Sequence, residues 1–77
     1  MKVRVFAMLK DHFEKEFDVD TPFADPGQLK NYLIKLKPQA SSILNNCRFA
    51  VNDDFVDINY KLQLNDTIVI LPPSSGG

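Results

Sequence analysis

The sequence contains few of the residues from which active sites are built: one cysteine, one histidine, three glycines and no tryptophan. A lone cysteine, Cys47, excludes an internal disulfide bond and a zinc site made of cysteines. A lone histidine, His12, excludes a pair of histidine ligands, and no glycine-rich loop inside the chain could cradle a phosphate. We therefore expect that the chain does not contain a complete active site of its own.

An excess of charge and long hydrophobic runs are also missing. Nine Lys and Arg residues stand against ten Asp and Glu residues, so the net charge of -1 predicts neither nucleic acid nor an anionic membrane as a partner. No apolar run approaches the ~20 residues that span a bilayer. Residues 1–5 alternate apolar with charged side chains, unlike the apolar core of a signal peptide, so we expect a cytoplasmic location.

Two weak candidates for chemistry are present. Cys47 and His12 could form a catalytic pair, and Asp53, Asp54 and Asp57 could bind a cation. We interpret the cysteine as a small core residue, because its neighbours resemble a strand that enters the core. We interpret the three carboxylates as part of a polar turn, because their spacing differs from that of a calcium loop.

Two strands are predicted at the start of the chain, over residues 2–9 and 14–20. In the first, odd-numbered and even-numbered residues occupy opposite faces, and Arg4 decides which face is buried. A guanidinium is rarely buried without a partner, so the odd-numbered face should point to the core. That choice places Phe6 and Met8 on the other side, where two large apolar residues suggest a second layer or a docking patch.

A helix is predicted to begin after Asp25. This residue would cap the helix, Pro26 would occupy its first position, and Gln28 would follow three residues after the cap. The helix should end before Pro38. Within it, three leucines recur at helical spacing and are expected to face the core: Leu29, Leu33 and Leu36.

The second half of the chain is predicted to form a loop and three strands. A loop or short irregular turn, pinned by Ile43 and Leu44, covers residues 39–46. The strands cover 48–51, 55–56 and 67–71, with turn residues at 52–54. The last strand is apolar on both faces, which favours a central position beside the first strand. The order β-β-α-β-β-β predicts an α+β fold in which a mixed sheet packs on one main helix.

The final segment consists of small residues: Pro72, Pro73, Ser74, Ser75, Gly76 and Gly77. The two prolines prevent strand pairing from continuing. Glycine has no Cβ, so the last two residues can pass through a slot that is too narrow for other side chains. Six extended residues span at most ~20 Å, which is enough to reach into a partner's pocket. A frayed terminus is the plain alternative.

Four stretches of the sequence carry a resemblance to a known family. They are Phe6-Ala7 in the opening strand, Ala50-Val51-Asn52 before the hairpin, residues 64–69, and the diproline and diglycine of residues 72–77. In these stretches the chain resembles the MoaD branch of the MoaD/ThiS sulfur carriers, the small subunits of molybdopterin synthase. The resemblance implies a ubiquitin-like β-grasp fold for residues 1–71 and a flexible tail at 72–77.

The resemblance also implies chemistry at the main-chain carboxylate of Gly77. An activating enzyme would use ATP to adenylate this carboxylate, and sulfur from a donor would convert it to a thiocarboxylate. The tail would then deliver the sulfur in the active site of the large subunit of molybdopterin synthase, for the dithiolene of molybdopterin. Catalytic side chains are expected on the partners, with no metal and no stably bound cofactor on this chain.

Two protein partners follow from the same resemblance. One is the large subunit, in a heterotetramer with two copies of each chain, and the other is the adenylating and sulfurating activating enzyme. Both would dock on a patch formed by Phe6, Phe55 and Leu71. From the residues alone, Phe55 could instead pack beneath the hairpin.

Three positions depart from the family's pattern. Asn65 stands where glycine is usual, and asparagine tolerates a left-handed conformation at such a turn. Ser74 and Leu71 replace residues that are commonly apolar and aromatic, which reduces the apolar contact offered to a partner. Three other functions stay open: a ThiS-like carrier for thiamin synthesis, a ubiquitin-like protein modifier and a structural adaptor. The diproline argues against the first of these.

Overall fold

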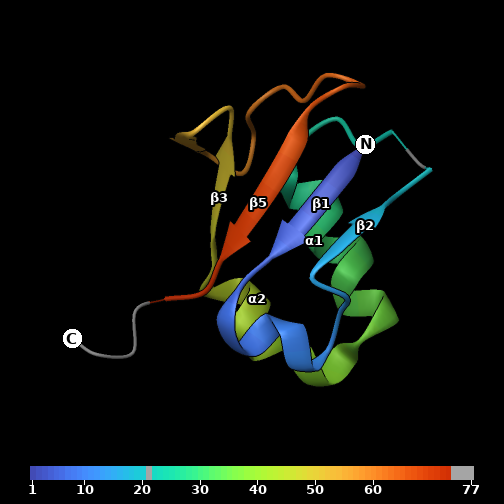
Figure 1. The fold of residues 1–77 in the computed structure, drawn as a ribbon, viewed down its shortest axis with the longest axis vertical. Coiled ribbons are helices and arrows are strands. Elements are labelled where there is room, and N and C mark those ends of the chain that lie inside the picture. The colour runs from blue at the N-terminus through green and yellow to red at the C-terminus, as the bar shows by residue number, and fades with distance from the viewer. Residues whose placement is uncertain (21, 74–77) are drawn as a thin grey trace.

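The structure, a computed structural model, describes residues 1–20 and 22–73. Within them, five strands form one mixed sheet in the order β2-β1-β5-β3-β4. The strands are β1 (Lys2–Val5), β2 (Glu16–Asp18), β3 (Arg48–Val51), β4 (Asp54–Val56) and β5 (Thr67–Leu71). The helices are α1 (Pro26–Leu36), α2 (Ser41–Asn45) and two short 3-10 helices, η1 (Ala7–Asp11) and η2 (Pro38–Ala40). Figure 1 shows the sheet with α1 behind it.

The first and last strands form the centre of the sheet, as predicted. They run parallel, with Val3 opposite Ile68 and Val5 opposite Ile70 (Figure 1). β3 pairs antiparallel with the other edge of β5. The four side chains named above are fully buried. Strand pairing on both sides and burial of alternate residues explain why β5 carries so few polar residues.

The core lies between one face of the sheet and the helices. Leu29 and Leu33 of α1 and Leu44 of α2 are fully buried there. The odd-numbered residues of β1 point into this core, as the position of Arg4 predicted, and Arg4 itself stays half-buried on the other face. The arrangement confirms the predicted α+β fold, in which a mixed sheet packs on one main helix.

The start of α1 is capped as predicted. Asp25 Oδ1 accepts a hydrogen bond from the backbone N–H of Gln28 at 2.9 Å, and Pro26 occupies the first helical position. Gln28 Oε1 in turn accepts a hydrogen bond from the backbone N–H of Ala24 at 3.0 Å. These reciprocal bonds satisfy N–H groups at and before the first turn, which lack partners within the helix. The helix ends before Pro38, also as predicted.

The first strand is shorter than predicted. β1 ends at Val5, and the chain then enters η1 instead of continuing as a strand to residue 9. Ala7 has a φ of 55°, which breaks the extended run and leaves this residue exposed. Leu9 is nevertheless fully buried, because η1 turns it into the core. The alternation of apolar residues thus continues past the end of β1, because the core needs Leu9 even though this residue lies in η1 and not in the strand.

Three other predictions of secondary structure or burial were wrong. β2 covers only residues 16–18 of the predicted 14–20. Residues 39–46 are mostly helical, because η2 and α2 bury Ala40 and Leu44 beneath the sheet. Leu36 is 52% exposed. It is the last residue of α1, where the chain turns away into η2, so the apolar stripe of the helix loses its contact with the core there.

A two-residue turn joins β3 to β4. Asn52 and Asp53 have φ values of 53° and 70°, and Val51 pairs with Asp54. Positive φ at both central positions is typical of a type I′ turn, whose twist matches that of the flanking strands. Asn65, by contrast, does not adopt a positive φ. The turn before β5 therefore does not need the left-handed conformation that was expected at this position.

Candidate functional site

The predicted tail starts at the end of the central strand. Leu71 is the last residue of β5, and it is half-buried, as is Pro72, whereas Pro73 is exposed. The other predicted tail residues lie outside the described part of the chain: Ser74, Ser75, Gly76 and Gly77. The structure thus places the root of the tail, at the middle of the sheet, next to β1 and β3.

The face of the sheet that points away from the core carries a second set of side chains. We call this set the open sheet face: Arg4, Phe6, Arg48, Ala50, Phe55, Val69 and Leu71. Ala50, the smallest of them, is buried among its neighbours. The strand register joins four of them in a row, since Phe55 lies opposite Ala50, and Val69 lies opposite both Ala50 and Arg4. None of the helices in the described residues covers this face (Figure 1).

All three residues of the predicted docking patch lie on the open sheet face. Leu71 lies opposite Arg48. Phe6 directly follows Val5, which is paired with Ile70, so Phe6 lies at the same end of the sheet as Leu71. Phe6 and Leu71 therefore lie together at the root of the tail, and Phe55 lies on the edge strand β4.

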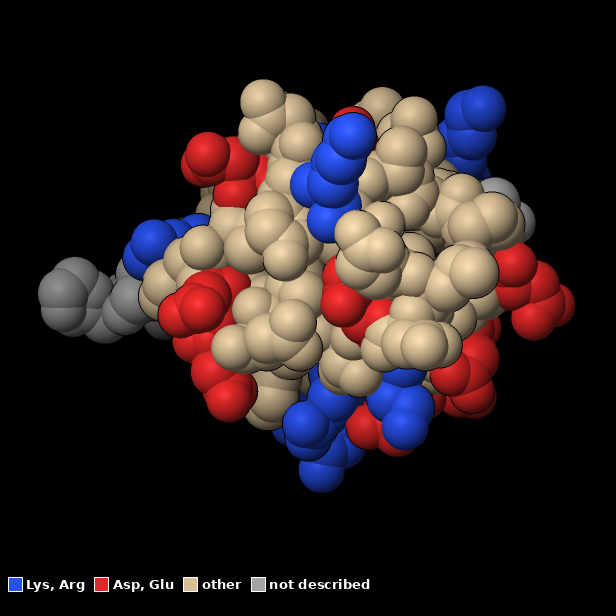
Figure 2. All heavy atoms as spheres, turned by 90° about the horizontal axis from the view of Figure 1, so that it is seen from above, with Lys and Arg blue, Asp and Glu red and all other residues tan. Residues whose placement is uncertain are grey.

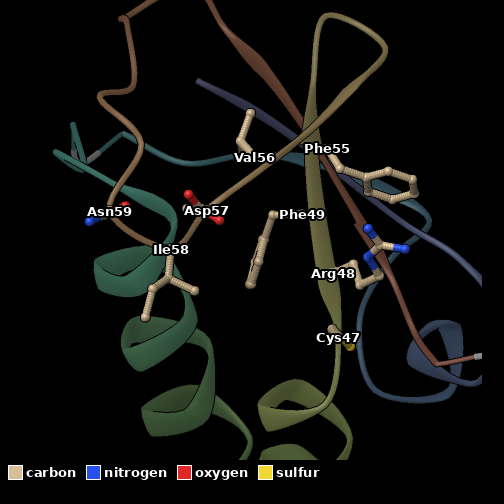
Figure 3. A pocket seen from close by; sticks show the side chains of 8 residues that line it. All are labelled: Cys47, Arg48, Phe49, Phe55, Val56, Asp57, Ile58 and Asn59. Carbon is tan, nitrogen blue, oxygen red and sulfur yellow. The ribbon is translucent and has the colours of Figure 1, made fainter.

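Phe55 is 55% exposed, so the alternative in which it packs beneath the hairpin is wrong. The guanidinium carbon of Arg48 lies 3.8 Å from the centroid of this ring. Figure 3 shows both side chains projecting to the same side of the hairpin. A cation–π contact of this kind contributes about 0.5–1 kcal/mol at an exposed site and restricts both side chains.

The second arginine of the open sheet face has a carboxylate partner within the chain. Arg4 Nε lies 3.3 Å from Glu16 Oε2, and Lys2 Nζ lies 3.6 Å from Glu16 Oε1. One carboxylate of β2 therefore pairs with two cations of β1. The guanidinium carbon of Arg4 also lies 5.8 Å from the centroid of the Phe6 ring. Both aromatic residues of the face thus have an arginine beside them.

A shallow hollow of about 630 Å³ lies beside β4. Residues from the start of β3, from β4 and from the loop that follows line it (Figure 3): Cys47, Arg48, Phe49, Phe55, Val56, Asp57, Ile58 and Asn59. Histidine is not among these residues, so the hollow does not bring His12 to Cys47. The described residues therefore give no support to the catalytic pair considered from the sequence.

Cys47 is held as a protonated thiol. Its Sγ donates a hydrogen bond to the backbone carbonyl of Ile43 at 3.0 Å. Burial raises the pKa of this thiol from 9.0 to about 11, because the interior disfavours the thiolate. Since the thiolate is the nucleophilic form, Cys47 is a poor nucleophile. It is partly buried and packs against the core from the outside, so the prediction of a small core residue is only partly confirmed.

The cation site considered at Asp53, Asp54 and Asp57 does not form. Within residues 1–20 and 22–73, no three His, Cys, Asp or Glu side chains gather as a metal ion would require. In the same residues no helix is long and apolar enough to cross a membrane. Figure 2 shows acidic and basic groups interspersed with uncharged surface at the end of the molecule opposite the root of the tail.

The contact between Arg48 and Phe55 was not predicted from the sequence, although a signal was present. The Asn52-Asp53 turn fixes the register of the hairpin, and this register places Ala50 opposite Phe55. Arg48 lies two residues before Ala50, so it is a diagonal neighbour of Phe55 on the same face. The register of the β3–β4 hairpin, applied to the residues that point away from the core, would have predicted the contact between Arg48 and Phe55.

The sequence and the fold were compared with those of known proteins. A sequence model described as the ThiS family matches residues 3–77, almost the whole chain. The chain is 38% identical to a molybdopterin synthase sulfur carrier subunit of Dictyostelium discoideum, in an alignment that covers 99% of this chain and 94% of that protein.

Two solved structures are also similar. In a complex of subunits 1 and 2 of molybdopterin-converting factor from Helicobacter pylori, one chain is 31% identical, with a TM-score of 0.69 and coverage of 99% of this chain and 96% of that one. SAMP1 of Haloferax volcanii is 20% identical, with a TM-score of 0.78 and coverage of 99% and 97%, and this likeness concerns the fold alone. The fold is the ubiquitin-like β-grasp, and the chain belongs to the MoaD/ThiS family of sulfur carriers.

Proposed function

We propose that this chain is the sulfur carrier subunit of a molybdopterin synthase and that it carries sulfur as a thiocarboxylate on Gly77. One observation carries the proposal: a relative that is 38% identical over 99% of the chain is named as this subunit. The family match, which extends through residue 77, supports it. The site described above also supports it, because burial raises the pKa of the Cys47 thiol, which makes this side chain a poor alternative carrier of sulfur.

The chemistry begins at an unreactive group. A carboxylate is a poor acyl donor, so an activating enzyme first joins an oxygen of the Gly77 carboxylate to the α-phosphate of ATP and releases pyrophosphate. A nucleophilic sulfur at the oxidation level of sulfide then attacks the carbonyl carbon, and AMP leaves with the bond electrons. The product is a thiocarboxylate at the end of the chain, and ATP is consumed without becoming a bound cofactor.

The structure of the carrier supports the delivery step. Its open sheet face presents Phe6 and Leu71 at the root of the tail, where a protein that receives the tail would make contact. We propose that the large subunit docks there and that the activating enzyme uses the same patch. Catalytic side chains then come from these partners, and the two glycines of the tail pass through a narrow entrance.

A cell that lacks its own sulfur carrier subunit provides the test. The intact chain should restore formation of the molybdenum cofactor, whereas deletion of Gly77 or addition of one residue after it should abolish this activity. Both variants should unfold at the same temperature as the intact chain, because the core of described residues is unchanged. Full activity of a variant with a stable added residue would overturn the proposal, since its carboxylate would no longer belong to Gly77.

A further inference from the structure

We propose that Arg48 is a specificity determinant of the open sheet face, which selects a partner surface that places a carboxylate against the Arg48 guanidinium. The inference rests on the proposed function, in which this face docks on the large subunit of molybdopterin synthase. It goes further, because it states a chemical requirement that the large subunit must meet.

The first step of the argument is geometric. The Arg48 guanidinium lies 3.8 Å from the centroid of the Phe55 ring, and Phe55 is the most exposed aromatic side chain of the open sheet face. Figure 3 shows the two groups stacked on the same side of the hairpin. A partner that covers the Phe55 ring therefore also covers Arg48 and removes its guanidinium from water.

The second step concerns charge. A guanidinium that loses its water is strongly destabilising unless an opposite charge and hydrogen-bond acceptors replace that water. Lys2 and Arg4 already have such a charge, because both pair with Glu16. Arg48, in contrast, forms no ion pair with any carboxylate of the part of the chain that the structure describes. The described residues thus offer Arg48 no compensating charge, and we assign that charge to the partner.

The third step concerns the type of acceptor. The guanidinium carbon lies 3.8 Å from the ring centroid, a separation typical of a guanidinium stacked on an aromatic ring. A stacked guanidinium can still donate hydrogen bonds from the N–H groups in its own plane. This fork matches the two oxygens of a carboxylate, and the resulting paired hydrogen bonds are both strong and directional. An aspartate or glutamate of the large subunit is thus the group that fits this position.

The fourth step concerns where Arg48 lies relative to the tail. Arg48 lies opposite Leu71, the residue from which the tail departs. A charge pair at this position would fix how the carrier is rotated on the partner and hence where the tail enters. Complementary charges raise the rate of productive association and disfavour wrong partners, so Arg48 would distinguish the cognate large subunit from proteins with an apolar or basic surface there.

The test measures binding of the large subunit from the same organism by titration calorimetry, at low and high salt. Arg48→Met should lower the affinity by about 30-fold or more, because the partner's carboxylate is then buried without a partner, and should weaken the salt dependence. Lys35→Met, which removes the same charge from the exposed surface of α1, should change the affinity less than about threefold. Thermal unfolding of both variants should match that of the wild type.

A second measurement identifies the carboxylate. Arg48→Lys keeps the charge and introduces an amine that a carbodiimide can couple to a carboxylate in contact with it. In the complex, this amine should be coupled to an aspartate or glutamate of the large subunit, as peptide mass spectrometry would show. The matched variant Arg4→Lys should be coupled within the chain, to Glu16, because that carboxylate is its neighbour.

The outcomes separate the inference from the proposed function. If the wild type binds and Arg48→Met binds equally well or more tightly, or if Arg48→Lys yields no coupling to the large subunit, then the role of Arg48 is wrong and the proposed function stands. If the wild type itself does not bind the large subunit, the proposed function fails and this inference fails with it.

Discussion

Cys47 shows how a single residue bears on the mechanism. A sulfur carrier could in principle carry sulfur on a cysteine, as a persulfide, so Cys47 competes with Gly77 as the site of attachment. The structure disfavours the cysteine, because its Sγ donates a hydrogen bond to the Ile43 carbonyl at 3.0 Å and burial raises the pKa of the thiol to about 11. The thiolate needed for sulfur chemistry is therefore scarce near neutral pH.

The raised pKa of Cys47 predicts slow alkylation. At about pH 8, iodoacetamide should modify this thiol at about one hundredth of the rate of a peptide cysteine with a pKa of 9.0, because a pKa of about 11 leaves that much less thiolate. The rate should continue to rise from pH 9 toward pH 11. Intact-mass spectra taken over time measure it, and the unfolded chain in denaturant serves as the control. A rate that levels off near pH 9 would contradict the raised pKa.

At the scale of elements, the parts of the fold that carry local signals were predicted from the sequence. Asp25, Pro26 and Gln28 determine the start of α1 through hydrogen bonds within a few residues of one another. The turn at Asn52 and Asp53 fixes the β3–β4 hairpin in the same local way. These elements need little help from distant parts of the chain.

Elements that depend on distant packing were not predicted. The bend after β1 exists because Leu9 enters the core from η1, and the helical turns after α1 exist because Ala40 and Leu44 are buried beneath the sheet. The candidate site shows the same division. The outward position of Phe6 followed from the alternating pattern that starts in β1, although Phe6 lies just after this strand. The contact of Arg48 with Phe55, in contrast, needed the register between two strands.

The different burial of two leucines in α1 leads to a prediction about stability. Leu33 is fully buried and Leu36 is 52% exposed, although the helical spacing places both on one stripe. Leu33→Ala should lower the free energy of unfolding by about 2–5 kcal/mol, because it leaves a cavity in the core. Leu36→Ala should change it by less than about 0.5 kcal/mol.

Urea unfolding followed by circular dichroism measures both values, and each variant is the other's control because both make the same substitution in the same helix. Equal losses for the two variants would contradict the burial that the structure assigns to α1.

At the scale of the whole molecule, the fold separates stability from function. The helices bury one face of the sheet, and the open sheet face together with the root of the tail is left for partners. Phe6 and Leu71 lie where β1 and β5 end, so a protein that binds this face is also placed to receive the tail. The proposed function thus uses surface that the core does not need.

This separation predicts that Phe6→Asp lowers binding to the large subunit and leaves the fold intact. Aromatic anchors in an interface are each worth about 2 kcal/mol or more, so the affinity should fall by at least about 30-fold. Leu64→Asp is the matched control, because Leu64 is 70% exposed in the loop before β5 and lies off the open sheet face. Titration calorimetry measures the affinities. Unchanged binding of Phe6→Asp would refute the docking patch.

The central claim, that the chain carries sulfur on its final carbonyl carbon, is tested most directly by the intact mass of the chain. The chain would be incubated with its activating enzyme, ATP and a sulfur donor, and then digested to locate any change. The account predicts a gain equal to the difference between a sulfur and an oxygen atom, confined to the C-terminal peptide at Gly77. Sulfur found on Cys47 instead, or a C-terminus joined to lysines of other proteins without any exchange of oxygen for sulfur, would contradict it.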